Sequence, residues 1–387
     1  VITDRINAEI LGARQQLHDT VEGGFEDIFN AVSNYVIDKG SQKKESREEE
    51  TKLRITANLI STDLWQGVIE PQIKALCVDI HKFTSILKAL LDDIGGLSKA
   101  AQDILSSVLV DIVSCKMRLT LVANDLASFI AEDERTCKWM EIKRHSRGQG
   151  IRLCNAPLSI SDDLKACLYD NYTTIILTSA TLTIGRTFKF YEDSIGLHQI
   201  PKDRLSELIL ESPFDYKKQS IIGIPTDISE PDKPGYVLAL GENILKTVEI
   251  SEGRALILFT SYSLLDNLYR RLEPQITQLG YTCLKQGMDN RHNLLETFKK
   301  DKTSVLFATD SFWEGIDVKG DALECVILTR LPFKVPTQPI IEARAEAIEM
   351  AGGDAFSDYS LPMAVIKFKQ GFGRLIRSCE DRGVVII

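Results

Sequence analysis

Long apolar runs are absent from this 387-residue sequence, although 44% of its residues are hydrophobic. No stretch reaches the roughly 18 apolar residues that a membrane span needs, so we expect no transmembrane helix and no membrane partner. The N-terminus, Val1-Ile2-Thr3-Asp4-Arg5, lacks an initiator Met and the apolar core of a signal peptide. We therefore expect a segment of a longer protein, with a core large enough for two or three domains.

Clustered cysteines are absent as well. The eight cysteines are scattered and no C-x-x-C pair occurs among them, which argues against a zinc site or an iron–sulfur cluster built from this sequence alone. We expect reduced, largely buried thiols, as is usual in a cytosolic protein, and no metal site. The cysteines occupy positions 77, 115, 137, 154, 167, 283, 325 and 379.

A basic excess is also missing, since the formal net charge is −9. Small DNA-binding domains usually have a strongly basic balance, so the charge disfavours that class. It is compatible with a protein that holds one nucleic-acid strand in a narrow groove, because such a groove needs only local positive charge.

Prolines are scarce in the first part of the chain, where Pro71 is the only one of twelve before residue 150. Apolar residues recur there at helical spacing, as in Ile73, Leu76, Cys77 and Ile80. We therefore predict four or five helices in an all-α domain that covers residues 1–152.

From about residue 172 the periodicity changes, because short runs rich in Val, Ile and Leu alternate with amphipathic helical patterns. Strands that are apolar on both faces and joined by helices indicate an α/β fold with a parallel sheet covered on both sides. Ligands of such folds gather beyond the carboxyl ends of the strands. The expected strands are 173–177, 220–224, 255–259, 304–308, 323–328 and 384–387, and the expected helices lie near 235–250, 262–273, 291–300, 337–350 and 361–377.

Hydroxyl side chains follow two of these strands. Ser179 and Thr181 come after the first strand, where they can hydrogen-bond a neighbouring carboxylate and change partner with the state of a bound phosphate. Thr260 and Ser261 come after the third strand and open the next helix, whose N-terminal amides suit a phosphate. Each pair alone is equally typical of an ordinary helix N-cap.

The loop after the fourth strand is dense in acidic, hydroxyl and aromatic residues, which are costly to bury without partners. Glu314, Gly315 and Asp317 are candidates for nucleotide binding, since Gly315 permits close backbone approach and Asp317 can hold the ribose or the catalytic water. Thr309 and Trp313 are candidates for contact with a nucleic-acid strand, Trp313 by stacking or packing.

The last predicted helix carries Gln370, Arg374 and Arg377 at the spacing i, i+4 and i+7, which puts all three on one face. Gly371 and Gly373 each cost about 1 kcal/mol relative to Ala in a helix, so two in one turn indicate close approach of a backbone or a phosphate. Two guanidinium groups beside an amide fit the γ-phosphate of ATP. Arginines bonded to surface carboxylates are the alternative.

These four groups occur in one order along the chain, and in that order the sequence resembles the superfamily 2 DNA helicases of the DinG/XPD group, more closely the bacterial DinG branch. The matching segments are Thr178-Ser179-Ala180-Thr181-Leu182, Phe259-Thr260-Ser261-Tyr262, Trp313-Glu314-Gly315-Ile316-Asp317, residues 331–339, and Gln370-x-x-Gly373-Arg374-x-x-Arg377.

The resemblance implies a RecA-like helicase domain 2 over residues 201–387, the end of helicase domain 1 over residues 153–200, and an arch-like position for the helical domain before them. It implies ATP-driven 5′→3′ movement on single-stranded DNA, unwinding of duplex or structured DNA in replication or repair, Mg²⁺, a monomer in the bacterial cytoplasm, and in some members an iron–sulfur cluster. The catalytic residues would be Arg374, Arg377 and Gln370, with Gly373 beside the nucleotide, while Ser179 and Thr181 would couple nucleotide to DNA.

The sequence departs from that family because it has no G-x-x-x-x-G-K-[ST] phosphate loop and no DEAH box. Family order places both upstream of Val1, so we expect that this chain alone cannot hydrolyse ATP. An RNA helicase of the DEAD/DEAH type is one alternative, although Gln370 in place of a His favours the DNA group. A non-catalytic α/β module that binds a nucleotide or a protein is another, and it would explain the acidic charge.

Overall fold

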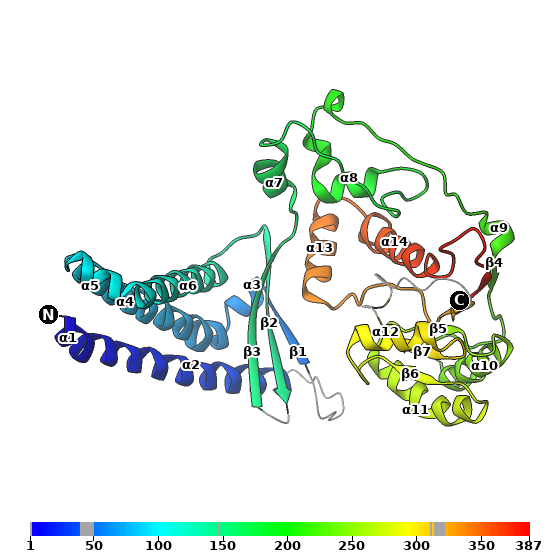
Figure 1. Ribbon diagram of the computed structural model, residues 1–387, viewed down its shortest axis with the longest axis horizontal. Helices are drawn as coiled ribbons and strands as arrows, with labels where there is room; N and C mark the ends of the chain where they lie inside the picture. The colour runs from blue at the N-terminus through cyan, green and yellow to red at the C-terminus, as the bar shows by residue number, and fades with distance from the viewer. Residues whose placement is uncertain (1, 39–49, 146–147, 232, 310–311, 313–321) are drawn as a thin grey trace. The chain divides into compact units, whose positions relative to one another are not determined.

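The computed structural model describes residues 2–38, 50–145, 148–231, 233–309, 312 and 322–387. They form two compact units, shown as ribbons in Figure 1. Unit 1 comprises Val1–Leu158 with Thr337–Arg344, and unit 2 comprises Ser159–Pro336 with Ala345–Ile387. The predicted division at residues 152 and 200 stays a prediction.

Three long helices make up most of unit 1: α2 (Leu11–Asp38), α4 (Glu70–Gly95) and α6 (Ser106–Ile130). Helix α4 packs against both of the others. Phe29, Ile69 and Phe129 are buried where these helices meet. The shorter helices are α1 (Ile2–Arg5), α3 (Ala57–Ile60) and α5 (Lys99–Ile104), with π-helical turns at Ile6–Ile10 and Trp65–Ile69.

A three-stranded antiparallel sheet completes unit 1, so the predicted helices are confirmed but the segment is not all-α. Its strands are β1 (Glu50–Ile55), β2 (Thr136–His145) and β3 (Gly148–Pro157), in the order β1-β2-β3. Lys138 and Glu141 are buried within β2, at 7% and 6% exposure. Charged residues at buried positions interrupt the apolar alternation by which a strand is recognised, which is why the sequence pattern missed this sheet.

Helix α13 (Pro339–Met350) begins in unit 1 and continues into unit 2. Its first turns are fixed to the small sheet, since Arg344 Nε donates to the Leu158 carbonyl at 3.1 Å and Glu342 forms an ion pair with Arg54 at 3.0 Å. These contacts explain why a segment late in the sequence belongs to the N-terminal unit.

Unit 2 is built on a six-stranded parallel sheet in the order β4-β9-β8-β5-β7-β6. Figure 1 shows its helices around the strands. The strands are β4 (Ser220–Gly223), β5 (Ala255–Leu258), β6 (Cys283–Lys285), β7 (Val305–Ala308), β8 (Cys325–Leu328) and β9 (Gly383–Ile386). The helices are α7 (Ser161–Leu164), α8 (Lys189–Ile195), α9 (Tyr216–Gln219), α10 (Tyr236–Ile250), α11 (Tyr262–Gln278), α12 (Arg291–Lys300) and α14 (Leu361–Phe372), with 3₁₀ or π turns at Lys165–Tyr169, Leu197–Gln199, Lys202–Arg204 and Phe356–Ser360.

Both faces of the central strands are buried, because successive side chains point to opposite sides. Ala255 and Ile257 of β5 pack with α10 and α11, whereas Leu256 and Leu258 pack with α12 and residues after α14. All four are 0% exposed. Polar groups of the central strands are therefore found only where those strands begin or end.

Five of the six predicted strands are confirmed, but residues 173–177 are not a strand. A parallel strand needs hydrogen bonds from a neighbour, and within the described residues this segment pairs with no strand. Its Ile176 is 85% exposed. Strand β6, with only three residues, is too short for an alternation to be read and was missed.

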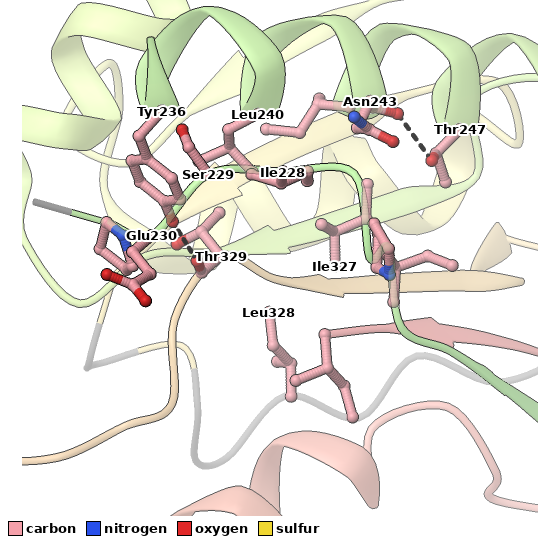
Figure 2. A pocket seen from close by; sticks show the side chains of 15 residues that line it. Ile228, Ser229, Glu230, Tyr236, Leu240, Asn243, Thr247, Ile327, Leu328 and Thr329 are labelled. Carbon is pink, nitrogen blue, oxygen red and sulfur yellow. Dashed lines mark hydrogen bonds between the residues drawn. The ribbon is translucent and has the colours of Figure 1, made fainter. Parts of the chain in front are cut away.

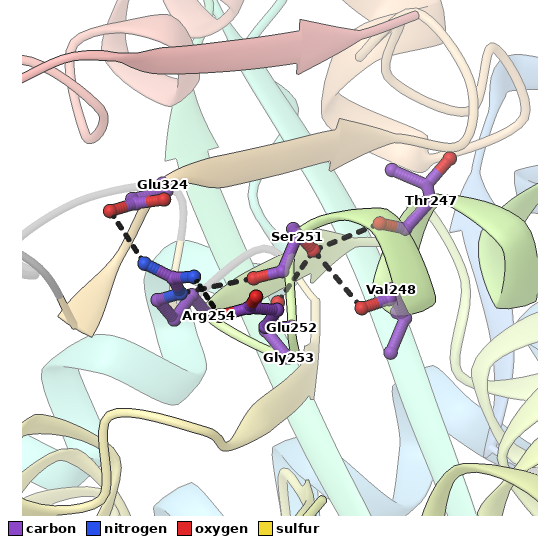
Figure 3. Close-up of polar contacts among 7 residues, drawn as sticks. All are labelled: Thr247, Val248, Ser251, Glu252, Gly253, Arg254 and Glu324. Atoms are coloured by element: carbon purple, nitrogen blue, oxygen red, sulfur yellow. Dashed lines mark hydrogen bonds and ion pairs between the residues drawn. The ribbon is translucent and has the colours of Figure 1, made fainter. Parts of the chain in front are cut away.

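The turn from α10 into β5 clamps the beginnings of three strands (Figure 3). Glu252, Gly253 and Arg254 all have positive φ, at 52°, 81° and 43°. The Arg254 guanidinium pairs with Glu324 at 2.8 Å and Glu252 at 2.5 Å, while its carbonyl accepts from the Glu324 and Cys325 amides at 3.0 and 3.1 Å. A Cβ at Gly253 would lie 2.3 Å from the Thr303 carbonyl oxygen, so β5, β7 and β8 meet here without room for a side chain.

We predict that Gly253→Ala destabilises unit 2 more than Gly280→Ala does. Gly280 has a similar φ of 88°, but no atom lies within 4 Å of the position that a Cβ would take there, so its change should cost only the strain of positive φ, about 1–2 kcal/mol. Gly253→Ala should cost at least about 2 kcal/mol more, because the methyl group collides with backbone. Hydrogen exchange of the β5 and β7 amides in increasing urea measures the difference, and equal costs would contradict the close packing at Thr303.

Candidate functional site

The carboxyl edge of the sheet carries three of the predicted site residues. Thr260 and Ser261 follow β5, and Thr309 follows β7, the strand that pairs with β5. Ser261 is the N-cap of α11, since its Oγ accepts from the Leu264 amide at 3.4 Å. The structure thus brings these three residues to one edge, as expected for parallel strands.

Gln286 connects two parts of this edge and was not identified from the sequence. Its Oε1 accepts from the Thr309 amide at 2.7 Å and from Thr309 Oγ1 at 3.0 Å, and its Nε2 donates to the hydroxyl of Tyr262. Thr309 is only 4% exposed. Its hydroxyl therefore lies beneath the edge and is held by Gln286, while Tyr262 stands at the surface.

Cys283 lies in β6, and the Tyr269 ring packs edge-on against Phe307 of β7 with the ring centroids 5.5 Å apart. Burial raises the pKa of the Cys283 thiol and that of the Tyr269 hydroxyl, each to about 12. The positive charge of Lys285 is balanced by Asp266 at 2.9 Å.

The remaining predicted residues of the β7 loop, Trp313, Glu314, Gly315 and Asp317, lie outside the described residues. Phe312, which precedes these four residues, is buried at 1% exposure, and its backbone amide donates to the Thr309 carbonyl at 2.9 Å. The roles of the four residues stay predictions.

The arginine segment does not form the single helix that we expected over residues 361–377. Helix α14 ends at Phe372, with Gly373 as its C-cap. Two glycines in the last turn weaken the helix, and the chain must turn to begin β9. Gln370 thus lies in the helix, whereas Arg374 and Arg377 lie after it. The prediction that all three residues share one helical face was wrong.

Because the helix ends before Arg374 and Arg377, contacts outside the helix fix the positions of these two arginines. Arg374 Nε donates to the Gln370 carbonyl at 2.9 Å, a carbonyl that the helix leaves without an internal partner. Leu375 and Ile376 are buried at 2% exposure each and anchor the segment in the core. The backbone amide of Arg377 donates to Asp381 Oδ2 at 2.7 Å.

Asp381 and Gln219 organise the loop that contains Arg377. Asp381 also accepts from the Ser378 amide at 2.8 Å and from Ser378 Oγ at 2.7 Å. Gln219, directly before β4, donates to the carbonyls of Ser378 and Asp381 at 2.9 and 3.0 Å. Because these residues precede β4 and β9, the arginine loop lies at the amino edge of the sheet. The tendency of ligands to gather beyond the carboxyl ends of parallel strands, on which we based the expected site, therefore does not extend to this loop.

The segment with Ser179 and Thr181 lies beside the end of α14. Lys369 Nζ donates to the Thr183 carbonyl at 2.8 Å, so residues two positions beyond Thr181 and directly before Gln370 are in contact. Ser179 Oγ accepts from the Thr181 amide at 3.3 Å in a local turn. That Ser179 and Thr181 change hydrogen-bond partner with the state of a bound phosphate stays a prediction.

A cavity of about 220 Å³ lies between α10 and the ends of β8 and β9, as Figure 2 shows. Its wall is largely apolar, with Leu240, Ile327 and Leu328. Within its wall the Tyr236 hydroxyl donates to the Thr329 carbonyl at 2.6 Å. None of the residues predicted from the sequence to bind a ligand lines this cavity.

Metal ligands and membrane spans can be assessed for the residues that the structure describes. No group of three or more His, Cys, Asp or Glu side chains there is arranged to hold a metal ion. Of the helices described, none is both long and apolar enough to cross a membrane.

Known proteins resemble this chain over much of its length. Residues 244–387 match the family model described as the helicase C-terminal domain. The chain is 40% identical over 253 residues to the ATP-dependent DNA helicase YoaA of Haemophilus influenzae, covering 65% of this chain and 37% of that protein. It is 35% identical over 254 residues to the ATP-dependent DNA helicase DinG of Photobacterium profundum, covering 65% of this chain and 36% of that protein.

A third relative is the 3′-5′ exonuclease DinG of Bacillus subtilis, which is 31% identical over 265 residues and covers 67% of this chain and 28% of that protein. The chain thus spans 28–37% of the length of these three relatives. A solved structure described as XPD_Helicase aligns with a TM-score of 0.49 and 18% identity, covering 75% of this chain and 52% of that one.

We predict that Asp381→Ala loosens the arginine loop without unfolding unit 2. The change removes the acceptor for two amides and one hydroxyl, and local opening should become easier by about 1–3 kcal/mol. Hydrogen exchange of the amides from 376 to 380 should then be at least roughly fivefold faster, whereas the β5 amides should be unchanged. Asp354→Ala is the matched control, because Asp354 accepts from the Phe356 and Ser357 amides and Ser357 Oγ in an equivalent turn. Faster exchange at 376–380 in the control, or none in Asp381→Ala, would contradict the assignment.

Proposed function

We propose that this chain carries the C-terminal helicase domain of a DinG-type, ATP-dependent DNA helicase, and that it supplies arginines to the ATP site and one wall of the single-stranded DNA groove. One observation supports this division most. The arginine loop lies at the amino edge of the sheet and the Thr260–Thr309 group lies at the carboxyl edge, so two different ligands can be bound at once.

At the amino edge we assign the nucleotide contact to Arg374 and Arg377. Guanidinium groups bind phosphate oxygens in a fixed geometry and stabilise the charge that develops when the γ-phosphoryl group is transferred. Gln370, at the end of α14, would position the arginines or the attacking water, and Gly373 leaves space beside them. Ser179 and Thr181 lie on the segment that Lys369 fastens to this helix, which suits a role in coupling nucleotide state to DNA.

Magnesium would accompany the nucleotide and neutralise its phosphates. The described residues offer no cluster for a metal ion, and we propose that its ligands come mostly from the rest of the helicase and from the nucleotide. No phosphate loop occurs in the 387 residues. This chain would therefore contribute half of an active site, and an iron–sulfur cluster, if the helicase holds one, would use other cysteines.

At the carboxyl edge we assign the DNA contact to Thr260 and Ser261, with Thr309 beneath them and Trp313 and Asp317 on the adjoining loop. Hydroxyls and amides at the start of α11 suit a backbone phosphate. The helicase would move 5′→3′ on single-stranded DNA and unwind duplex or structured DNA as a monomer in the bacterial cytoplasm.

We predict that Arg377→Ala in the complete helicase lowers kcat for ATP hydrolysis by about a thousandfold while ATP binding stays measurable, because an arginine finger acts chiefly in the transition state. Arg377→Lys should recover little of the activity, since lysine keeps the charge but not the planar fork. Steady-state kinetics and nucleotide binding measure the two effects.

Arg382→Ala is the control for that experiment, because Arg382 is an exposed arginine close by in the same segment. It should leave kcat within about twofold of the wild type, as surface changes usually do. Unchanged turnover in Arg377→Ala would remove the finger assignment.

We also predict that the purified 387-residue chain binds single-stranded DNA but does not hydrolyse ATP, because it contains no phosphate loop. Fluorescence anisotropy and a phosphate-release assay test the two halves separately. DNA-stimulated ATP hydrolysis by this chain alone would refute the proposal that it contributes only half of the active site. Tighter binding of single-stranded RNA than of single-stranded DNA would favour an RNA helicase instead.

A further inference from the structure

Tyr262 is an aromatic side chain that the structure both exposes and holds in place. It is the first residue of α11, and 57% of it is exposed. An exposed tyrosine ring normally samples several rotamers, and binding it in one of them costs conformational entropy. Here the Gln286 side-chain amide donates to its hydroxyl, so the ring is fixed before any ligand arrives.

Gln286 is itself rigidly placed. Its backbone amide donates to the Phe307 carbonyl at 2.9 Å. The backbone amide of Met288 donates to the Lys285 carbonyl at 3.1 Å and so closes a turn. Gly287 takes φ 94° at the third position of that turn, a conformation that favours glycine. The side-chain oxygen of Gln286 is used by Thr309, which leaves the amide nitrogen to face Tyr262.

The surroundings of the ring are apolar as well as polar. Met288 is 59% exposed on the same edge, and its sulfur accepts a hydrogen bond from Tyr269 at 3.4 Å. Ser261, whose hydroxyl and neighbouring amides suit a phosphate, directly precedes the ring in the chain. A phosphate contact and an aromatic face therefore stand one residue apart, which is the combination that nucleotides of a single strand require.

We propose that Tyr262, held by Gln286, is a stacking platform for one unpaired base of the bound strand, while the Ser261 end of α11 contacts the adjoining phosphate. This subsite depends on the proposed DNA contact at the carboxyl edge. Stacking does not distinguish bases, because each has a π face, so the platform accepts any sequence. Gln286 acts as a positioning residue and does not touch the strand.

The test measures binding of the 387-residue chain to fluorescein-labelled oligothymidylate and to an abasic oligomer of equal length, which keeps the phosphates and lacks the bases. Tyr262→Leu should bind oligothymidylate about tenfold more weakly than the wild type, the loss expected for one stacked base. It should bind the abasic oligomer as well as the wild type does. Tyr262→Trp should bind oligothymidylate at least as tightly as the wild type, and Tyr262→Phe, which keeps the ring without its tether, should be about threefold weaker.

Tyr172→Leu is the matched control, because Tyr172 is a tyrosine of unit 2 with 58% exposure, outside the proposed groove. It should bind both oligomers like the wild type. The salt dependence of binding should be the same for Tyr262→Leu and the wild type, since the number of phosphate contacts is unchanged.

The outcomes separate this subsite from the function on which it depends. Failure of the wild-type chain to bind either oligomer would overturn the proposed DNA contact and the platform with it. Normal binding of oligothymidylate by Tyr262→Leu would overturn the platform alone. Equal weakening of Tyr262→Leu toward both oligomers would also overturn it, because that result indicates a structural role for the ring.

Discussion

Burial of the parallel sheet on both faces is the constraint on which the rest of unit 2 depends. With α10 and α11 over one face and α12 and α14 over the other, the central strands β5, β7 and β8 hold only apolar side chains. An unpartnered polar group inside such a layer costs several kcal/mol or more. Around these strands, hydroxyls, amides and guanidiniums therefore lie in the residues just before or just after them, and each edge becomes a separate polar surface.

At each edge of the sheet, hydrogen bonds between separate segments fix the positions of the loops. At the amino edge, Arg254 joins the starts of β5 and β8 through its guanidinium and its carbonyl, and Asp381 fixes the loop that leads into β9. These contacts are made to the backbone of each loop. They therefore fix the backbone positions from which the charged side chains of the loop extend. At the carboxyl edge, Gln286 performs the same task through one amide group shared between α11 and β7.

The sequence predicted those parts of the fold whose signal is local. Ala255 to Leu258 and Val305 to Ala308 are continuous apolar runs, and a run of that kind between turn residues identifies a buried strand. Residues 173–177 have a similar composition, yet they form no strand, because pairing depends on neighbours that a local pattern does not contain. The sheet in unit 1 was missed for the opposite reason, since buried Lys138 and Glu141 make its β2 resemble a surface segment.

The candidate site divides in the same way. Thr260, Ser261 and Arg377 stand in recognisable motifs. Gln286 and Gln219 instead act through contacts with residues distant in the sequence, 23 positions away for Gln286 and Thr309 and 162 positions away for Gln219 and Asp381. Gln370 and Arg374 lie four residues apart, and a helical face was the natural interpretation of that spacing. The glycines beside them end the helix instead, so the same two residues meet through a carbonyl–guanidinium bond. A motif therefore identifies which chemical groups a site uses, but their placement follows from the contacts that fix the backbone around them. In this sheet those contacts lie at its two ends, where they fix the backbone of the arginine loop at the amino edge and the residues around Thr309 and Tyr262 at the carboxyl edge.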